Sequence, residues 1–163
     1  MTAPEWFFSA LALVGTVSAL RLVTAKNVVH AALYLVVTLA MVGAMYLLLA
    51  AEFVAWVQVL IYVGAIVVLL LFGLMLTRAP IGREVLDNQQ RGFAAVVGLG
   101  FLVGLTLLVW DAFQDAEIEL TTSTTAGIGD SLFRSFILPF EVVGFLLLAA
   151  LIGAIVLARR EEG

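Results

Sequence analysis

The sequence predicts an all-α integral membrane protein with five transmembrane helices, the N-terminus outside and the C-terminus in the cytoplasm. Of its 163 residues 64% are hydrophobic, and the mean hydropathy is +1.18. Charged residues make up only 12%, which is about half of what a soluble domain carries. Most of the chain must therefore face lipid or apolar protein, and we expect a single membrane domain over residues 1–163.

Five apolar stretches are long enough to cross the hydrocarbon layer, which takes about 20 residues in a helix. Arg21 lies close enough to the end of the first stretch for its side chain to reach the interface. Only Glu52 marks a turn between the second and third, so these two should form a tight antiparallel hairpin. Pro139 falls in the first turn of the fifth. The spans are expected at about 6–25, 28–51, 53–77, 92–110 and 138–158.

The basic residues orient these spans. Glu5 precedes the first span where a signal peptide would carry positive charge, so we expect this span to stay uncleaved, with the N-terminus outside. Basic residues favour cytoplasmic loops. Five spans then place seven of the eight basic residues in the cytoplasm and only Arg134 outside. The seven are Arg21, Lys26, Arg78, Arg83, Arg91, Arg159 and Arg160.

The fourth loop, about 111–137, is the only sizeable polar piece, and it should lie outside. It is rich in acidic residues and contains the run TTSTTAGIG. Such a run of small and hydroxylated residues is typical of a loop or a short hairpin. The loop is too short to form a folded domain.

Composition excludes several kinds of site. There is no Cys, hence no disulfide and no thiolate-held cluster. One His and scattered carboxylates give no metal-ligand spacing, and no glycine-rich phosphate loop is present. The net charge of -4 argues against a nucleic-acid binder. We therefore predict no catalytic, cofactor-binding or metal-binding residue in the chain.

Small residues recur at four-residue spacing in most spans, which lets helix backbones approach closely in lipid. Five short-looped helices cannot satisfy all of these faces with one another, so the pattern indicates protein partners in the membrane. The pairs are Gly15 with Ala19, Ala40 with Ala44, Gly100 with Gly104, Ala149 with Gly153, and Ala150 with Ala154.

The third span carries unexpected residues at its centre. Gln58, Tyr62, Ala65 and Leu69 would share one stripe of an α-helix. The two polar side chains should point into protein or a water-lined cavity, because an unpaired polar group in hydrocarbon is costly. A hydrogen-bonded packing contact explains them as well as a functional role does. Gly64, beside the stripe, favours either close packing or a change of helix winding such as a π-bulge.

Three further ionisable residues have two interpretations each. Glu141, at the start of the fifth span, is either an acid stabilised by the helix dipole or a proton-handling carboxylate on a polar path. Glu52 is expected to be a solvated turn acid. His30, with Tyr34 one turn later, is expected to be an interfacial residue rather than a proton relay.

The third span resembles a known family. The run FVAWVQVLIYVGAIVVLLLFGLML is similar to the third helix of the chain 6 (subunit J) family of proton-pumping NADH-quinone oxidoreductase, respiratory complex I. NVVHAALYLVVTL and FEVVGFLLLAALIGAIVLARRE resemble its second and last helices. The likeness covers all five spans in order. The third-helix motif is matched by Gln58, Val59, Ile61, Tyr62, Gly64, Ala65, Ile66, Val68 and Leu69.

The resemblance implies a non-redox membrane-arm subunit that helps couple quinone reduction to proton translocation. It implies a third helix that can carry a π-bulge at Tyr62 and Gly64, with Ala65 completing a conformational gate. Gln58 and Glu141 would be polar-path residues. Some relatives have a glutamate at the position of Gln58, and a glutamine there can hold water but cannot carry a proton.

The resemblance also implies partners and place. The complex would use NADH, FMN, iron-sulfur clusters and a quinone, all bound by other subunits. This chain would sit beside subunits like K, H, A and the antiporter-like subunits, as a multi-pass protein of the bacterial cytoplasmic (inner) membrane. Three alternatives stay open: a purely structural scaffold, a subunit of a related cation/proton antiporter assembly, and a small stand-alone carrier.

Overall fold

The computed structural model describes residues 3–77, 90–114 and 124–159, and every regular element in these ranges is a helix. Five helices are long and apolar enough to cross a membrane, which confirms the predicted all-α class. The third of these spans is continuous but changes its winding twice. The elements are α1 (Ala3–Thr24), α2 (Val28–Leu48), α3 (Glu52–Val57), the π-helix η1 (Gln58–Ile66), α4 (Val67–Leu76), α5 (Arg91–Phe113), α6 (Thr125–Arg134) and α7 (Ile137–Ala158).

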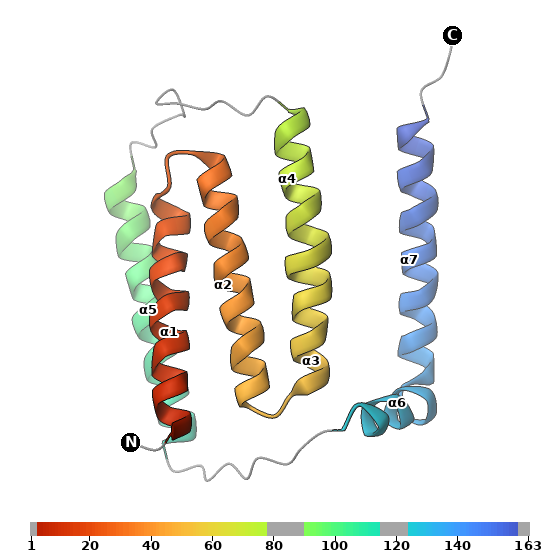
Figure 1. The fold of residues 1–163 in the computed structure, drawn as a ribbon, viewed down its shortest axis with the longest axis horizontal. Coiled ribbons are helices and arrows are strands. Elements are labelled where there is room, and N and C mark those ends of the chain that lie inside the picture. Colours follow the sequence, from red (N-terminus) through yellow and green to blue (C-terminus); the bar gives the residue numbers. More distant parts are fainter. Residues whose placement is uncertain (1–2, 78–89, 115–123, 160–163) are drawn as a thin grey trace. The chain divides into compact units, whose positions relative to one another are not determined.

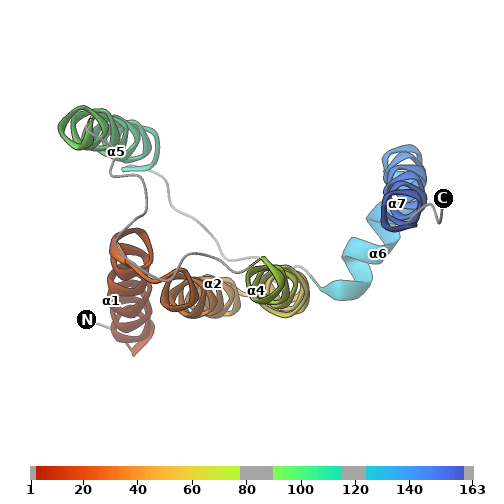
Figure 2. The same ribbon diagram turned by 90° about the horizontal axis from the view of Figure 1, so that it is seen from above.

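The chain forms two compact units, residues 1–121 and 122–163. In the first, α2 packs on α1 on one side and on α3, η1 and α4 on the other, so the three spans stand in a row (Figures 1 and 2). All the buried residues in the part of the chain that the structure describes belong to this row. They are Ser18, Ala32, Gly43, Ala55, Gln58 and Val67.

A three-residue turn joins α2 to α3 and makes the tight hairpin that the sequence predicts. Ala51 N–H donates to Tyr46 C=O at 2.9 Å, and Ala50 N–H donates to Leu47 C=O at 3.1 Å. This pair of bonds is a Schellman motif, which satisfies carbonyls that the helix end leaves free. The motif needs a left-handed residue after the helix, and Ala50 supplies it with φ 57°.

Ala50→Gly is expected to stabilise this turn, because glycine takes the left-handed conformation without the steric cost that a Cβ brings. We expect the amide of Ala51 to exchange with deuterium about fivefold more slowly, corresponding to ~1 kcal/mol. Ala51→Gly is the matched control, since Ala51 has φ -94° and gains nothing from glycine. Equal exchange in both variants would contradict the assignment of strain to Ala50.

Two local predictions in these regions are wrong. Glu52 is exposed, as expected, but it is the first residue of α3 and not a turn residue, because the Schellman motif closes the turn one residue earlier. The second half of TTSTTAGIG is neither loop nor hairpin, because α6 begins at Thr125. The side chain of Thr124 caps α6 by accepting the N–H of Gly127 at 3.2 Å. Residues 121–123 of that run lie outside the described residues.

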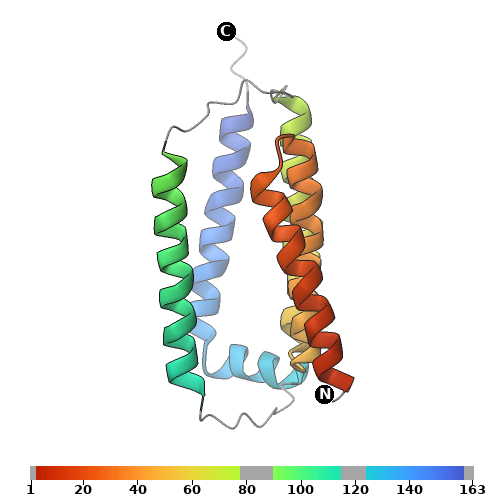
Figure 3. The same cartoon turned by 90° about the vertical axis from the view of Figure 1, so that its left-hand side faces the viewer.

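In the second unit, α6 lies across the end of α7 (Figure 3). The rings of Phe133 and Phe140 meet edge to face with centroids 5.2 Å apart and an interplanar angle of 67°. Within α6, Arg134 Nε and Asp130 Oδ1 form an exposed ion pair at 2.6 Å. A short helix turned across the end of a transmembrane helix fits the membrane interface, where its polar face can stay in water.

Candidate functional site

The centre of the third span is wound more loosely than an α-helix. At the start of η1 the N–H of Gln58 still bonds to carbonyls three and four residues back, on Ala55 and Val54. At its end the N–H of Val67 donates to Tyr62 C=O, five residues back. The π-winding that the resemblance implied at Tyr62 and Gly64 is thus present, and it extends over nine residues, Gln58–Ile66. Such segments are rare and frequently mark functional sites.

Gln58 anchors the beginning of the π-helix to α2. Its side chain is only 8% exposed, and its Nε2 donates to the backbone carbonyl of Leu39 at 3.4 Å. The prediction that Gln58 points into protein is confirmed. A buried amide between two membrane helices needs such a partner, because lipid offers none.

Gly43 makes room for this anchor. A Cβ on Gly43 would lie 3.4 Å from Val59 Cγ2 and 3.5 Å from Gln58 Cγ, so only a very small residue fits between α2 and η1. Sequence reasoning singled out Ala40 and Ala44 on this helix and missed Gly43. The signal was present as a glycine in the middle of the second span, where close helix packing selects small residues.

The π-winding sets which residues face α2. Gln58 is 8% exposed and Val67 is 1% exposed, so both lie on the buried side of the third span. They are nine residues apart, and an α-helix would rotate about 900° over that distance and place them on opposite faces. The wider π-turns bring them back to the same face. Regular α-winding would therefore turn one of the two ends away from α2.

The α-helical stripe predicted for this span is wrong for Ala65 and Leu69, for the same reason. Tyr62 is 45% exposed and Leu69 is 71% exposed, and Ala65 is exposed as well. The stripe assumed a constant α-helical period, which fails where the helix is π-wound. The residue that shares the buried face with Gln58 across the π-helix is Val67, which no polar or small-residue signal distinguishes.

Gly64 lies on the exposed side of the π-helix. A Cβ there would meet Val59 C=O, one π-turn earlier, at 3.4 Å, which is an ordinary contact. The π-helix thus tolerates alanine at this position but leaves little space for a branched side chain. Gly73, in α4, has no atom within 4 Å of a Cβ built on it, which provides a reference glycine in the same span.

Glu141 lies on α7, in the second unit, and is exposed. It was predicted in the first helical turn, and this is wrong, because α7 begins at Ile137 and Glu141 is its fifth residue. The dipole of the helix N-terminus falls off beyond the first turn, so it does not account for this acid. Pro139 does lie in the first turn, where its missing N–H leaves no bond unmade.

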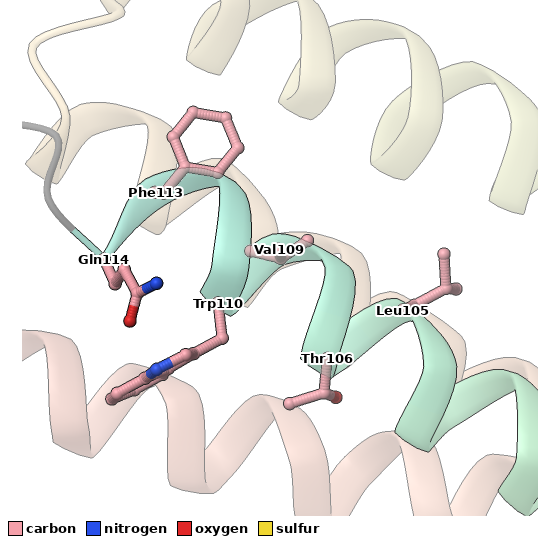
Figure 4. Close-up of a pocket in the computed structure, with 6 residues that line it drawn as sticks. All are labelled: Leu105, Thr106, Val109, Trp110, Phe113 and Gln114. Atoms are coloured by element: carbon pink, nitrogen blue, oxygen red, sulfur yellow. The ribbon is translucent and has the colours of Figure 1, made fainter.

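The fourth span shows no comparable site. Every α5 side chain that the structure describes is exposed. Figure 4 shows a hollow along this helix that is bounded by α5 alone, so it has no second wall to position a ligand. The described residues also contain no group of three potential metal ligands. The side chains lining the hollow are Leu105, Thr106, Val109, Trp110, Phe113 and Gln114.

The sequence of the chain matches that of a known protein family. Residues 18–157, which run from the last two turns of α1 into the last turn of α7, match the family described as NADH-ubiquinone/plastoquinone oxidoreductase chain 6. The chain belongs to this family. Proteins of this family are subunits of NAD(P)H-quinone oxidoreductase complexes, as the third-span motif indicated. The five apolar helices agree with a subunit that spans the membrane.

Relatives of this chain 6 protein come from several kinds of organism. It is 42% identical to the organellar NAD(P)H-quinone oxidoreductase subunit 6 of Paulinella chromatophora, over 94% of this chain and 77% of the relative. It is 40% identical to the F(420)H(2) dehydrogenase subunit J of Methanosarcina mazei, over 94% and 90%. It is 35% identical to the NADH-quinone oxidoreductase subunit J of Rhodobacter capsulatus, over 99% and 85%.

Proposed function

We propose that this chain couples quinone reduction to proton translocation by rewinding its third span between π- and α-helix. Tyr62, Gly64 and Ala65 form the conformational gate, while Gln58 and Glu141 belong to the polar path. The chain contributes no redox chemistry of its own. It works beside subunits like K, H and A and the antiporter-like subunits of a complex I-type enzyme.

One observation supports this proposal above all. Gln58 and Val67 lie on the same buried face only because the segment between them is π-wound. An α-wound third span would differ from this one in which end contacts α2, and a coupling element needs two such states. The exposed Tyr62 lies between the two ends and changes its direction when the winding changes.

Rewinding leaves the anchor in place and turns the remainder of the third span. Gln58 is held by the carbonyl of Leu39 and by the close approach at Gly43, whereas a Cβ on Gly64 would meet only Val59 of its own span. Val67 then leaves α2 and rotates with α4 by about half a turn. A rotation of this kind exchanges the side chains that face a neighbouring subunit without moving the helix far, and it can open or close a water path.

The electron donor has two candidates. The names of the Paulinella and Rhodobacter relatives specify NAD(P)H and NADH, which favour an NADH-oxidising complex with FMN and iron-sulfur clusters in other subunits. The 40% identity to a subunit of an F(420)H(2) dehydrogenase favours a complex that takes electrons from a reduced deazaflavin instead. The coupling proposed for the third span is the same in both.

We further propose that the N-terminus lies outside and the C-terminus in the cytoplasm of a bacterial inner membrane. The chain has no Cys, so single cysteines report position directly. Glu52→Cys, directly after the α2–α3 turn, should react with a membrane-impermeant maleimide in intact cells. Ala25→Cys, in the α1–α2 turn, should react only in inverted vesicles. The reverse labelling would contradict the orientation.

A pull-down tests the function. The tagged chain is extracted from its native membranes in mild detergent, its co-purifying chains are identified, and quinone reduction is assayed with NADH and with reduced deazaflavin. Flavin and iron-sulfur subunits with inhibitor-sensitive activity on one donor would establish the complex and its donor. Recovery of the chain alone, or with antiporter subunits and no donor oxidation, would contradict the proposal.

A further inference from the structure

The end of the row at the α1–α2 turn carries a basic pocket, which the coupling function does not use. Arg21 from the last turn of α1, Lys26 from the turn and His30 from the first turn of α2 line a cavity of about 290 Å³. Tyr34 closes it one helical turn further along α2. Two fixed positive charges, an imidazole and a phenol thus converge on one small space.

The local backbone holds these groups together. Asn27 caps α2, with its Oδ1 accepting the N–H of Val29 at 2.9 Å. This bond fixes the turn immediately after Lys26. The cations are exposed, and none of Arg21, Lys26 and His30 forms an ion pair or side-chain hydrogen bond in the part of the chain that the structure describes.

The two acids among the described residues of this row, 3–77, lie at its far end. Glu5 begins α1 and Glu52 begins α3, while the pocket lies at the opposite end of α1 and α2. Helices of this length separate the two ends by about 30 Å, so neither carboxylate can neutralise the pocket. Among the described residues, the pocket therefore keeps its positive charge unneutralised by a carboxylate of the row.

The residues around the pocket indicate which kind of anion it could bind. The pocket lies where two membrane-spanning helices end, at the depth where lipid headgroups begin. Directly beside it, Val23 is 78% exposed and Leu33 is 52% exposed, which gives acyl chains an apolar surface to follow. Tyr34, half-buried at the rim, has the amphipathic ring typical of the membrane interface.

We propose that this pocket binds the phosphate headgroup of an anionic phospholipid. Arg21 and Lys26 contact the phosphate, His30 and Tyr34 donate hydrogen bonds to it, and the acyl chains lie along α1 and α2. Basic pockets between transmembrane helices bind anionic headgroups in this way. The site is independent of the proposed rewinding, because it lies on the α1–α2 turn and not on the third span.

The test uses the complex as purified with the tagged chain, in nanodiscs of phosphatidylcholine with a small fraction of photo-crosslinkable phosphatidylglycerol. Mass spectrometry then locates the labelled residues. We expect labelling within residues 20–34. Each basic residue near an anionic headgroup contributes about fivefold, so Arg21→Gln with Lys26→Gln should lower the labelling about 25-fold. Arg134→Gln with Arg159→Gln removes the same charge elsewhere and should leave it unchanged.

Two further arms separate the sources of the anion. Unlabelled phosphatidylglycerol should compete, whereas inorganic phosphate at the same concentration should not. Exchanging the two side chains, Arg21→Lys with Lys26→Arg, keeps the charge and should restore labelling. Equal labelling in both glutamine pairs would show non-specific annular lipid, and competition by inorganic phosphate would show a free-anion site. Either result would overturn the proposal.

Discussion

Gly64→Val is expected to lower coupled turnover about tenfold per assembled complex. In the π-helix a Cβ at this position already lies 3.4 Å from Val59 C=O, and the two further methyl groups of valine would crowd that carbonyl. Overpacking of this kind costs about 1–3 kcal/mol, and 1.4 kcal/mol is a factor of ten in a two-state equilibrium. The variant should hold the third span in its α-helical winding, so quinone reduction and proton translocation fall together. Both are measured in reconstituted vesicles and normalised to the amount of complex.

Two variants control for side effects of this change. Gly64→Ala adds only the Cβ, which makes an ordinary contact, and should stay within about twofold of the wild type. Gly73→Val places the same side chain in α4, where no atom lies within 4 Å, and should also be near normal. Assembled Gly64→Val complex with wild-type turnover and pumping would reject the gate. Loss of assembly alone would support the scaffold alternative.

Gly43→Leu should act on assembly and not on turnover. Its Cβ alone would touch Val59 and Gln58 at 3.4 and 3.5 Å, so a leucine must push α2 away from η1. The hydrogen bond from Gln58 to Leu39 would then break, leaving a polar side chain unpaired between membrane helices. We expect about 30-fold less chain in the purified complex, because overpacking and the lost bond each cost about 1 kcal/mol, and ~2 kcal/mol is a factor of about 30.

Quantitative blotting of membranes and of purified complex checks this second prediction. Gly43→Ala is the matched control and should assemble normally, since its Cβ fits within ordinary contact distance. The complex that does assemble with leucine should turn over at nearly the wild-type rate. Normal assembly of Gly43→Leu would show that α2 and the π-helix are not held together as described.

The sequence was informative about the spans because hydrocarbon thickness and hydropathy determine them almost alone. Five spanning helices, the tight hairpin and a buried Gln58 were all predictable. The third-span motif also led to the correct family, since its Gln, Tyr and Gly are residues that hydropathy does not explain.

The features that could not be predicted depend on helix winding and on exact helix ends. A constant α-helical period put Ala65 and Leu69 on the face of Gln58, whereas π-winding puts Val67 there. A valine inside an apolar run gives no sequence signal that it will lie on the buried face. Glu141 was displaced from the first turn by a one-residue error in the start of α7, and small errors at helix ends are common because ends depend on local capping.

Rewinding of the third span is tested most directly by imaging the purified complex at rest and during turnover at a resolution that resolves the backbone. The readout is the carbonyl that accepts the N–H of Val67, which is Tyr62 in the π-helix and would be Val63 in an α-helix. We predict that turnover populates a second class, in which the bond passes to Val63 and Val67 has left α2 while Gln58 remains on Leu39. A single π-wound class under both conditions, with Val67 buried against α2 throughout, would contradict the coupling role of this helix.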